Sequence, residues 1–371
     1  MPPSRSTWPV WWRVLLADRL FLLLALAMPA LAWTSGTPLG ACAGLVNWPT
    51  IATLAGLLML TKGIELSGLL QRAAHHLLLR MHSERGLALL LVASAELSAM
   101  LLTNDVALFI LVPLTLGLHA MARKLPTVRL VVFQALAVNA GSTLTPIGNP
   151  QNLFLWQVSG VGFGSFVLTM APLAALLSVL MLTLTVFSFS GRPIDVEEDL
   201  RPAALDLRLA WVSLLLFPAF LILIDQRLSG WALALVTLSY LARYRSVPAR
   251  CDWNLILVFI LMFIDLRLMA RLEDIRRLLA AADWSAYAGV IVVSQLISNV
   301  PAAILLSGFH GDWRGLAWGA NVGGYGWMLG SLANLIALRM LNMNRSWLVF
   351  HLYSIPFLAV AALLAGALLA R

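Results

Sequence analysis

Small and amide-bearing residues interrupt the apolar sequence twice. NAGSTLTPIGNPQN occupies 139–152, and NVGGYGWMLGSLANL occupies 321–335. Gly and Pro interrupt helices and leave backbone N–H groups free for anions and C=O groups free for cations, while Asn, Ser and Thr add neutral hydrogen-bonding groups. The residues expected to bind a substrate or ion are Asn139, Gly141, Ser142, Thr143, Thr145, Pro146, Asn149 and Asn152 in the first interruption, and Asn321, Gly323, Gly324 and Asn334 in the second.

Two other apolar runs carry a polar tip near the middle, LLTNDVALFI at 101–110 and LISNVPAAIL at 296–305. The further candidate binding residues at these tips are Thr103, Asn104 and Asp105 in the first and Ser298, Asn299 and Pro301 in the second. A carboxylate beside an amide could bind Na⁺ as a ligand or exchange a proton. Asp105 is therefore the first candidate for a coupling residue, and Na⁺ is expected near Asn104 and Asp105.

Other carboxylates also lie within apolar runs, where an unpaired charge costs at least ~2.5 kcal/mol. Asp265 and Glu96 are the second candidates for coupling. Glu65 lies close to Lys62 near the end of its run, and a local ion pair or snorkelling explains both. No Cys or His spacing indicates a resident metal. We expect no cofactor beyond a coupling Na⁺ or H⁺.

The elements that must position these residues are membrane-spanning helices. The 371 residues are 61% hydrophobic and 11% charged, which is outside the usual range of soluble domains. The net charge of +8 is spread over short gaps between apolar runs, as in a membrane topology signal, and is not gathered into a nucleic-acid-binding patch. We predict a multi-pass protein surrounded by lipid, with no nucleic acid partner.

The apolar runs predict about nine crossings and two re-entrant hairpins. The expected crossings are 20–34, 45–62, 130–158, 165–189, 209–225, 228–242, 252–267, 314–338 and 347–370, and the expected hairpins are 86–119 and 284–309. With the N-terminus cytoplasmic and the C-terminus outside, most of the 25 Lys and Arg residues fall on the cytoplasmic side. The amphipathic segments 66–86 and 268–279 precede the hairpins and are expected at membrane surfaces.

The order of elements repeats along the chain. When the two interruptions are aligned without a gap, Asn139 coincides with Asn321 and Asn152 with Asn334. The second copy enters the membrane from the opposite side, which predicts an all-α polytopic membrane protein with two inverted-topology repeats. Each repeat has one re-entrant hairpin and one broken transmembrane helix, at 130–158 and 314–338. The expected units are a first repeat at 1–190, a cytoplasmic linker and connecting helix at 191–227, and a second repeat at 228–371.

The sequences LLTNDVALFILVPLTLGL, NAGSTLTPIGNPQNLFLW, SNVPAAILL and GANVGGYGWMLGSLANLIALR resemble the ion transporter superfamily with its citrate-transporter-like domain. That superfamily includes arsenite permeases, sodium/proton antiporters and divalent anion/sodium symporters. The likeness extends over both halves of the chain, and the length is similar to that of the short bacterial inner-membrane transporters called YbiR-like. The resemblance implies a protein of the bacterial inner (plasma) membrane, often a homodimer, with hairpin tips and helix breaks forming the substrate and ion sites.

By position, the resemblance places Thr103, Asn104 and the 141–145 loop in one half-site, and Ser298, Asn299 and the 322–326 loop in the other. Both tips depart from the Ser-Asn-Thr of the dicarboxylate branch, since they read Thr-Asn-Asp and Ser-Asn-Val-Pro. An ionised carboxylate at the first tip would repel a dianion unless it were protonated or paired with a cation. The first tip is more similar to the arsenite-permease side of the superfamily.

The sequence thus favours a secondary active transporter of a small anion or oxyanion, coupled to H⁺ or Na⁺ and working by alternating access. The alternative is a sodium/proton (cation/proton) antiporter with Asp105 and Asp265 as carriers, and a passive anion channel is a third possibility. No motif of an intramembrane enzyme is present. No nucleotide-binding P-loop is present either, so ATP drive would require a separate ATPase subunit. The sequence leaves open the substrate, the stoichiometry and the direction of flux.

Overall fold

The computed structural model describes residues 19–69, 83–121, 125–193, 204–281, 284–341 and 345–371, together with Arg72 and Met343. Within these residues the secondary structure is helical apart from one antiparallel bridge between Ser83 and Pro193. Most of the amphipathic segment expected at 66–86 lies outside the described residues. The all-helical part of the sequence prediction is confirmed.

Within the described ranges, four helices are long and apolar enough to cross a membrane. They are α3 (Trp48–Leu66), α9 (Phe163–Ser188), α10 (Leu207–Asp225) and α19 (Ser346–Leu369). A fifth crossing could come from α2 (Arg19–Thr34) and the 3₁₀ helix η1 (Leu39–Leu45), which meet at an angle of 111°. The apolar window of α3 is 67% buried, whereas those of α9, α10 and α19 are 22–28% buried. We infer that α3 is an interior helix and that the other three offer wide apolar faces to lipid.

Shorter helices complete the set of expected spans. α11 (Ser229–Arg243) and α13 (Trp253–Met269) match the expected spans at 228–242 and 252–267, and the short α12 (Ser246–Ala249) connects them. The amphipathic segment expected at 268–279 contains α14 (Glu273–Ala281), whose residues are largely exposed. The number of crossings is not fixed by helix length, because several elements are too short to span alone.

Both polar tips lie where two helices meet. α5 (Glu84–Leu101) packs against α6 (Asn104–Met121), and α15 (Ala286–Ile297) packs against α16 (Asn299–Leu306). The first pair is joined by Leu102 and Thr103, and the second by Ser298 alone. At the first tip, Asn104 Oδ1 accepts the backbone N–H of Asp105 at the start of α6.

Both Gly-rich interruptions are breaks between helices. The first break separates α7 (Thr127–Gly141) from α8 (Pro150–Ser159), and the second separates α17 (Trp313–Val322) from α18 (Leu332–Leu341), with a 3₁₀ turn η2 (Met328–Gly330) between them. α8 starts where Asn149 Oδ1 accepts the N–H of Asn152 at 2.8 Å, with Pro150 in the first helical position. The sequence thus encodes both the end of one helix and the start of the next.

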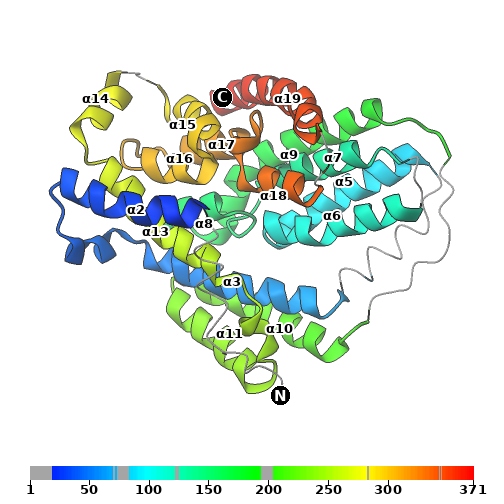
Figure 1. Ribbon diagram of the computed structural model, residues 1–371, viewed down its shortest axis with the longest axis horizontal. Helices are drawn as coiled ribbons and strands as arrows, with labels where there is room; N and C mark the ends of the chain where they lie inside the picture. Colours follow the sequence, from blue (N-terminus) through cyan, green and yellow to red (C-terminus); the bar gives the residue numbers. More distant parts are fainter. Residues whose placement is uncertain are drawn as a thin grey trace, which may run out of the picture.

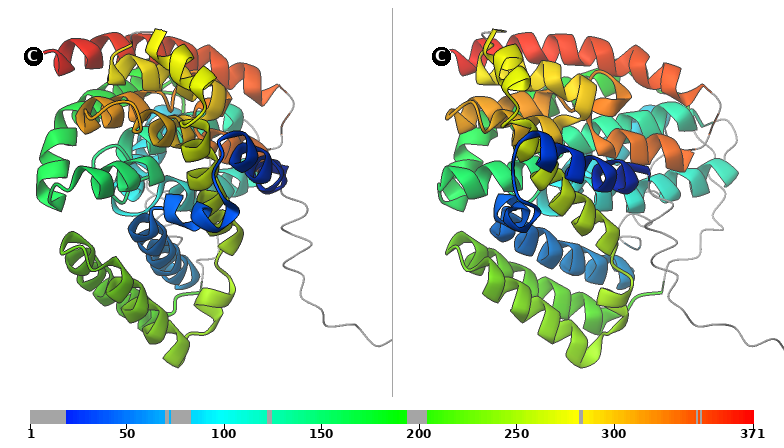
Figure 2. Two further views of the ribbon diagram at one scale, coloured as in Figure 1. Left: turned by 90° about the vertical axis from the view of Figure 1, so that its left-hand side faces the viewer. Right: turned by 60° about the vertical axis from the view of Figure 1, so that its left-hand side comes forward.

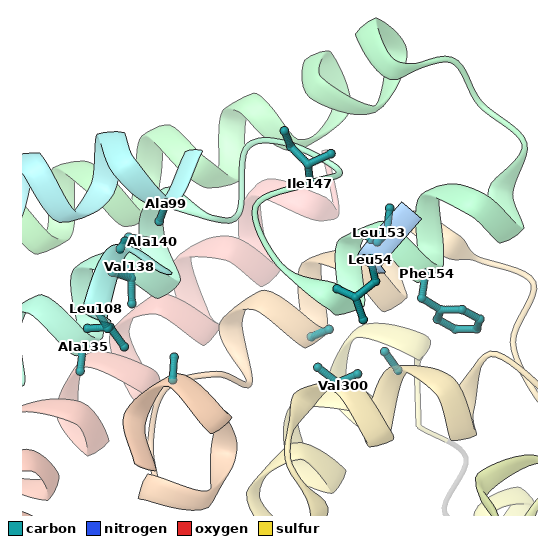
Figure 3. Close-up of a cluster of buried hydrophobic side chains, with 14 of the residues drawn as sticks. Leu54, Ala99, Leu108, Ala135, Val138, Ala140, Ile147, Leu153, Phe154 and Val300 are labelled. Atoms are coloured by element: carbon teal, nitrogen blue, oxygen red, sulfur yellow. The ribbon is translucent and has the colours of Figure 1, made fainter. Parts of the chain in front are cut away.

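The helices fall into two groups in space. α3, α10 and α11 lie together at the bottom of Figure 1, and both views of Figure 2 separate them from the layer that contains the hairpins and the breaks. α13 packs against α2, α3 and α16 and so connects the groups. Buried side chains of α3, α5, α6, α7, α8 and α16, including Leu54, Ala99 and Val300, gather around the first break (Figure 3).

Gly141, the last residue of α7, is required by close packing. An added Cβ would overlap the backbone carbonyl of Glu96 on α5. We expect Gly141→Ala to destabilise the protein by about 1–3 kcal/mol, because overpacking forces a backbone shift. Gly117→Ala on α6 is the matched control, since its Cβ would meet nothing within 4 Å and glycine in a helix costs about 0.5–1 kcal/mol relative to alanine. Thermal unfolding of the purified variants measures both changes, and equal midpoints would contradict the packing argument.

Candidate functional site

The two helix breaks meet in the protein interior through reciprocal asparagine hydrogen bonds. Asn139 Nδ2 donates to Asn334 Oδ1 at 2.9 Å, and Asn321 Nδ2 donates to Asn152 Oδ1 at 2.6 Å. All four side chains are buried. In the alignment of the two interruptions, Asn139 corresponds to Asn321 and Asn152 to Asn334. Each bond therefore joins the first of these positions in one break to the second position in the other break.

Asn321 is the most connected member of this network. Its Oδ1 accepts the Thr143 hydroxyl at 3.2 Å and the Asn149 amide at 2.9 Å. On the other side, the Ser331 hydroxyl donates to Asn139 Oδ1 at 3.1 Å. The two breaks therefore act as one hydrogen-bonded unit rather than as two separate loops.

The same amides satisfy carbonyl groups that the breaks leave without helical partners. Asn152 Nδ2 donates to the carbonyls of Ser142, Thr143 and Thr145 at 3.2, 3.0 and 3.2 Å. Asn334 Nδ2 donates to the Gly324 carbonyl at 2.9 Å. A buried carbonyl without a partner costs about 1–3 kcal/mol, so these bonds permit the interruptions. The amides expected to bind a ligand are thus already engaged within the protein.

The first hairpin tip joins the first break, as the resemblance implied. The backbone N–H of Asn104 donates to the Gly148 carbonyl at 3.0 Å, and the Thr145 hydroxyl donates to the Met100 carbonyl at 2.8 Å. Thr103 and Thr145 are each partly exposed. Their hydroxyls are therefore the accessible neutral groups of this half.

The second hairpin joins the second break through Gln295. Its Nε2 donates to the Gly323 carbonyl at 3.0 Å, and its Oε1 accepts the backbone N–H of Trp327 at 2.9 Å. The Asn299 amide lies beside Gly324, 3.1 Å from where a Cβ would be. Pro301, the remaining predicted residue of this tip, is half-buried one turn into α16.

Ser298 holds a strained backbone at the second tip. Its φ of +74° and ψ of 156° place it in a region that glycine alone adopts readily, at a cost of order 1–3 kcal/mol. The side chain is 8% exposed, and its hydroxyl has no hydrogen-bond partner within the described part of the chain. The second tip thus combines a strained backbone with a hydroxyl that makes no bond to the described residues.

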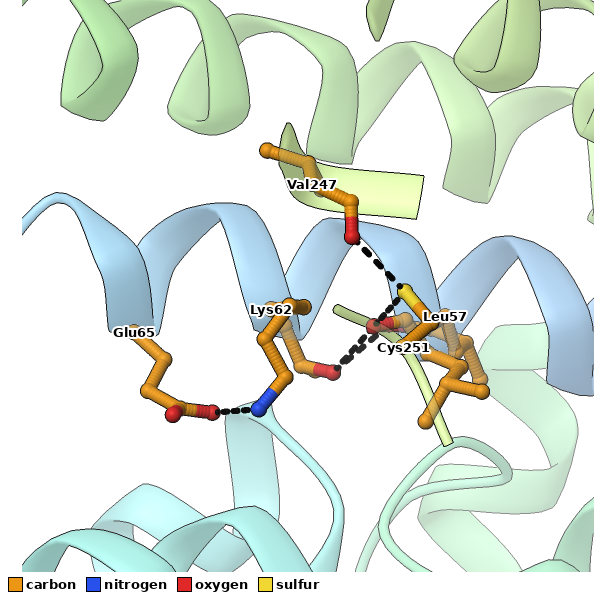
Figure 4. A network of polar contacts seen from close by, with 7 residues as sticks. Leu57, Lys62, Glu65, Val247 and Cys251 are labelled. Carbon is orange, nitrogen blue, oxygen red and sulfur yellow. Dashed lines mark hydrogen bonds and ion pairs between the residues drawn. The ribbon is translucent and has the colours of Figure 1, made fainter. Parts of the chain in front are cut away.

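Within the described residues, the Asp105 side chain makes no hydrogen bond to the asparagine network. The carboxyl of Asp252, next to the start of α13, acts electrostatically on that of Asp105. The Lys62–Glu65 ion pair of α3, at 2.6 Å, lies in the same neighbourhood, close to Cys251 (Figure 4). The expected local pairing of these two α3 residues is confirmed. Asp105 therefore occupies the boundary between the first hairpin and the α3 group of helices.

Among the described residues, the hydrogen bonds of the Cys251 thiol go to backbone carbonyls. Its Sγ lies 3.3 Å from the Val247 carbonyl and 3.7 Å from the Leu58 carbonyl (Figure 4). Burial raises the pKa of the Cys251 thiol to about 12, because the thiolate would lose its hydration. At neutral pH the residue is an unreactive thiol that packs between α12 and α3.

The other two candidate carboxylates are buried apart from the tips. Asp265 on α13 is 2% exposed, and neither of its oxygens has a hydrogen-bond partner in the ranges the structure describes. Glu96 on α5 is 5% exposed and packs behind Gly141. The structure therefore brings the tips and breaks together and leaves Asp105, Asp265 and Glu96 in three separate surroundings.

Two residues of the site escaped the sequence prediction. Gln295 lies just before the polar tip of the second hairpin, and Asp252 acts electrostatically on Asp105. A polar Gln three residues before the Ser298 tip was a usable signal, since amides are rare in an apolar run. The position of Asp252 gave no comparable signal, because its partner is distant in sequence.

An all-helical membrane protein whose hairpins and broken helices meet at buried polar groups is built as a transporter. The profile of the citrate transporter family, CitMHS, matches residues 10–309, and the chain belongs to this family. It is 42% identical over 361 residues to inner membrane protein YbiR of Escherichia coli, covering 96% of this chain and 97% of that protein.

A more distant relative and a solved structure agree with this class. The uncharacterized transporter MJ0456 of Methanocaldococcus jannaschii is 30% identical over 310 residues, covering 81% of this chain and 83% of the relative. The crystal structure of the Alcanivorax borkumensis YdaH transporter aligns over 95% of this chain and 97% of its own, with a TM-score of 0.57 and 14% identity. That likeness shows the fold. The protein is thus a membrane transporter of the CitMHS family.

The reciprocal asparagine bonds are testable by double-mutant cycles. We expect Asn321→Ala to cost about 1–3 kcal/mol, since it leaves buried partners unsatisfied. Combining it with Asn152→Ala should cost less than the sum, with a coupling of about 0.5–3 kcal/mol. Thermal unfolding of the purified variants measures the coupling. The control pairs Asn321→Ala with Thr115→Ala, whose hydroxyl bonds Gln134, and should be additive. Additivity in both pairs would rule out the network.

The strain at Ser298 predicts an unusual order of stabilities. Ser298→Gly should be about 1 kcal/mol more stable than Ser298→Ala, because glycine relieves a strain of about 1–3 kcal/mol at an entropy cost of about 0.5–1 kcal/mol. Alanine removes the same hydroxyl and keeps the strain, so it is the matched control. The midpoints of thermal unfolding decide the order, and an alanine variant at least as stable as the glycine variant contradicts the prediction.

Proposed function

We propose that the protein is a secondary active transporter of a small anion or oxyanion across the inner membrane, coupled to H⁺ or Na⁺ and working by alternating access. The observation that carries the proposal is the pair of reciprocal Asn139–Asn334 and Asn321–Asn152 hydrogen bonds between the breaks. They place two interrupted helices around one buried centre. Paired discontinuous helices of this kind are the arrangement that transporters use for substrate and coupling-ion sites.

Two inverted repeats account for the packing of the rest of the molecule. α7 packs on α18 and α17 packs on α8, and in the same way α3 packs on α11 and α13 packs on α2. In each of these two sets, the second contact repeats the first with the roles of the units 1–190 and 228–371 exchanged. Residues 191–227 then form the linker and connecting helix. We propose about nine crossings and two hairpins for this arrangement. The N-terminus is then cytoplasmic and the C-terminus outside.

The helix termini favour an anion together with a cation. α6, α8, α16 and α18 each begin at a tip or a break, and the N-terminal end of a helix attracts negative charge. α5, α7, α15 and α17 each end there, and their free carbonyls attract cations. Because the amides are engaged in holding the breaks, we assign ligand contacts to the hydroxyls of Thr103 and Ser298 at the hairpin tips and of Thr145 in the first break. A protein that binds both charges in one place can couple their movement.

Asp105 is the proposed coupling residue of the first tip. The Asp252 carboxyl acts electrostatically on that of Asp105, and a proton or Na⁺ bound at Asp105 would relieve this repulsion. Asp265 and Glu96 are the second candidates. A homodimer is proposed as the assembled form, and a separate ATPase subunit is the alternative means of drive.

The second candidate function is a sodium/proton antiporter. The observation that favours it is the presence of carboxyls within three helices, since Glu96 on α5 and Asp265 on α13 are buried and Asp105 on α6 is partly exposed. In that case the transported species are cations and no anion is required. A passive anion channel is the third candidate, and transport against a gradient distinguishes it from the first.

The test uses purified protein in liposomes, with charge movement and internal pH recorded while a panel of small anions is stepped with and without a Na⁺ or proton gradient. We expect a response to one anion that requires the cation gradient and falls at least tenfold in Asp105→Asn. Asp274→Asn, on the exposed α14, is the matched control and should respond like the wild type.

Other outcomes of this experiment select among the candidates. Proton movement driven by Na⁺ alone, indifferent to every anion, would replace the leading proposal with the antiporter. Anion flux that never exceeds its own electrochemical gradient, and is unchanged in Asp105→Asn, would indicate a channel.

A further inference from the structure

Glu96 has a buried carboxyl that forms no ion pair with any described residue. It lies on α5, two turns before the first hairpin tip, and is 5% exposed. Its Oε1 has no hydrogen-bond partner among the residues the structure describes. A lone carboxylate in this position would cost several kcal/mol, so a group that neutralises it must be accounted for.

Two other unsatisfied polar groups interact with this carboxyl. The Tyr325 hydroxyl, in the second break, is fully buried and without a partner in the described part of the structure, and the carboxyl of Glu96 acts on it electrostatically. The Ser178 hydroxyl lies on α9, which packs against α5, and it interacts with the same carboxyl while having no hydrogen-bond partner among the described residues. Unsatisfied oxygens from three separate elements thus interact around one carboxyl.

The position of this region connects the two breaks. The backbone of Glu96 packs against Gly141, where the first break starts. Tyr325 follows Gly324, whose carbonyl accepts the amide of Asn334 in the asparagine network. The Tyr325 ring packs on Phe357 of α19 with centroids 4.6 Å apart. Glu96 therefore contacts the first break directly and acts electrostatically on Tyr325 in the second break.

No other charge near this region serves as the counter-ion. The elements packed against α5 are α6, α7 and α9, and α9 has no titratable residue. α7 has only Arg129, at its far end, where it pairs with Glu84 of α5 at 3.0 Å. α6 has Asp105 at the tip and His119, whose side chain lies outside the described residues. Among the described groups, none brings a positive charge to Glu96.

We propose that Glu96, Ser178 and Tyr325 form a proton-binding site, distinct from the Asp105 tip, that links the two helix breaks. A protonated carboxyl donates one hydrogen bond and accepts others, and the two hydroxyls can each donate or accept, so a proton satisfies all three residues. Release returns the proton to water and leaves a carboxylate that needs both hydroxyls as donors. The role of this proton in transport rests on the proposed function, but its binding does not.

A sodium ion fits this site less well than a proton. Hard cations take about six oxygen ligands. The described side chains supply one carboxyl and two hydroxyls, while the nearby carbonyls of Gly323 and Gly324 are already hydrogen-bonded to Gln295 and Asn334. A proton needs no further ligands, so the site is assigned to H⁺.

The test is infrared spectroscopy of the full-length protein in lipid as pH is stepped from acid to alkaline without any substrate. We expect a carboxylic acid band from a buried, protonated side chain that titrates with pH and is lost in Glu96→Gln. Tyr325→Phe and Ser178→Ala should each shift the same band without removing it, since each deletes one hydrogen-bond partner. These two variants keep the carboxyl, so they test the site even if Glu96→Gln does not fold.

Two matched controls fix the assignment. Asp265→Asn removes a different buried carboxyl, and Tyr287→Phe removes a hydroxyl that donates to the Ala362 carbonyl at 2.8 Å. Both should leave the Glu96 band in place. An unchanged spectrum in Glu96→Gln would overturn the proposal, as would a carboxylate band that persists in acid and responds to Na⁺. If the wild-type protein shows the Glu96 band but transports none of the anions tested, that result counts against the proposed function alone.

Discussion

The structure depends on how backbone groups are satisfied where a helix is interrupted inside the membrane. Water cannot reach such a break from the lipid, so each free carbonyl needs a partner from the protein. Here the partners are side-chain amides. Asn152 alone donates to three carbonyls of the first break, and Asn334 donates to one of the second. Without these amides, neither interruption would be stable in the interior of the protein.

Neutral amides have an advantage over charges for this purpose. A buried ion pair must regain a large desolvation cost, and breaking it leaves a charge stranded. An amide offers donors and an acceptor at much lower cost, so one residue can serve its own break and the opposite one. Asn321 does this by donating to Asn152 while accepting from Thr143 and Asn149. The centre is held together by neutral groups, and the hairpin tips remain free to bind a charged ligand.

Much of the fold could be predicted because membrane helices depend on composition and length. The ends of α9, α11 and α19 lie within two residues of the expected limits, since long apolar runs leave little choice. The breaks were equally predictable, because Gly, Pro and Asn are out of place in lipid-facing sequence. The citrate transporter profile and the helical transporter neighbour support the same class.

The site was less predictable because its partners are far apart in sequence. The pairing of Asn139 with Asn334 follows from alignment of the repeats only once the breaks are known to face each other. The direction of a side chain was not predictable at all. Asp105 shares its tip with Asn104, yet its carboxyl interacts electrostatically with Asp252 at the start of α13, because consecutive residues at a helix start point to different sides.

The placement of the carboxyls divides the molecule in a way that bears on how it could move. Asp105 belongs to the hairpin layer, whereas Asp252 stands at the start of α13, which connects that layer to α3. Glu96, Ser178 and Tyr325 all belong to the hairpin layer, which holds both breaks. A displacement of the start of α13 against the hairpin layer would therefore change the Asp105–Asp252 interaction and leave the Glu96 cluster intact. The first pair would respond to the position of the hairpin layer, whereas the second cluster would respond to the shape of the breaks within it.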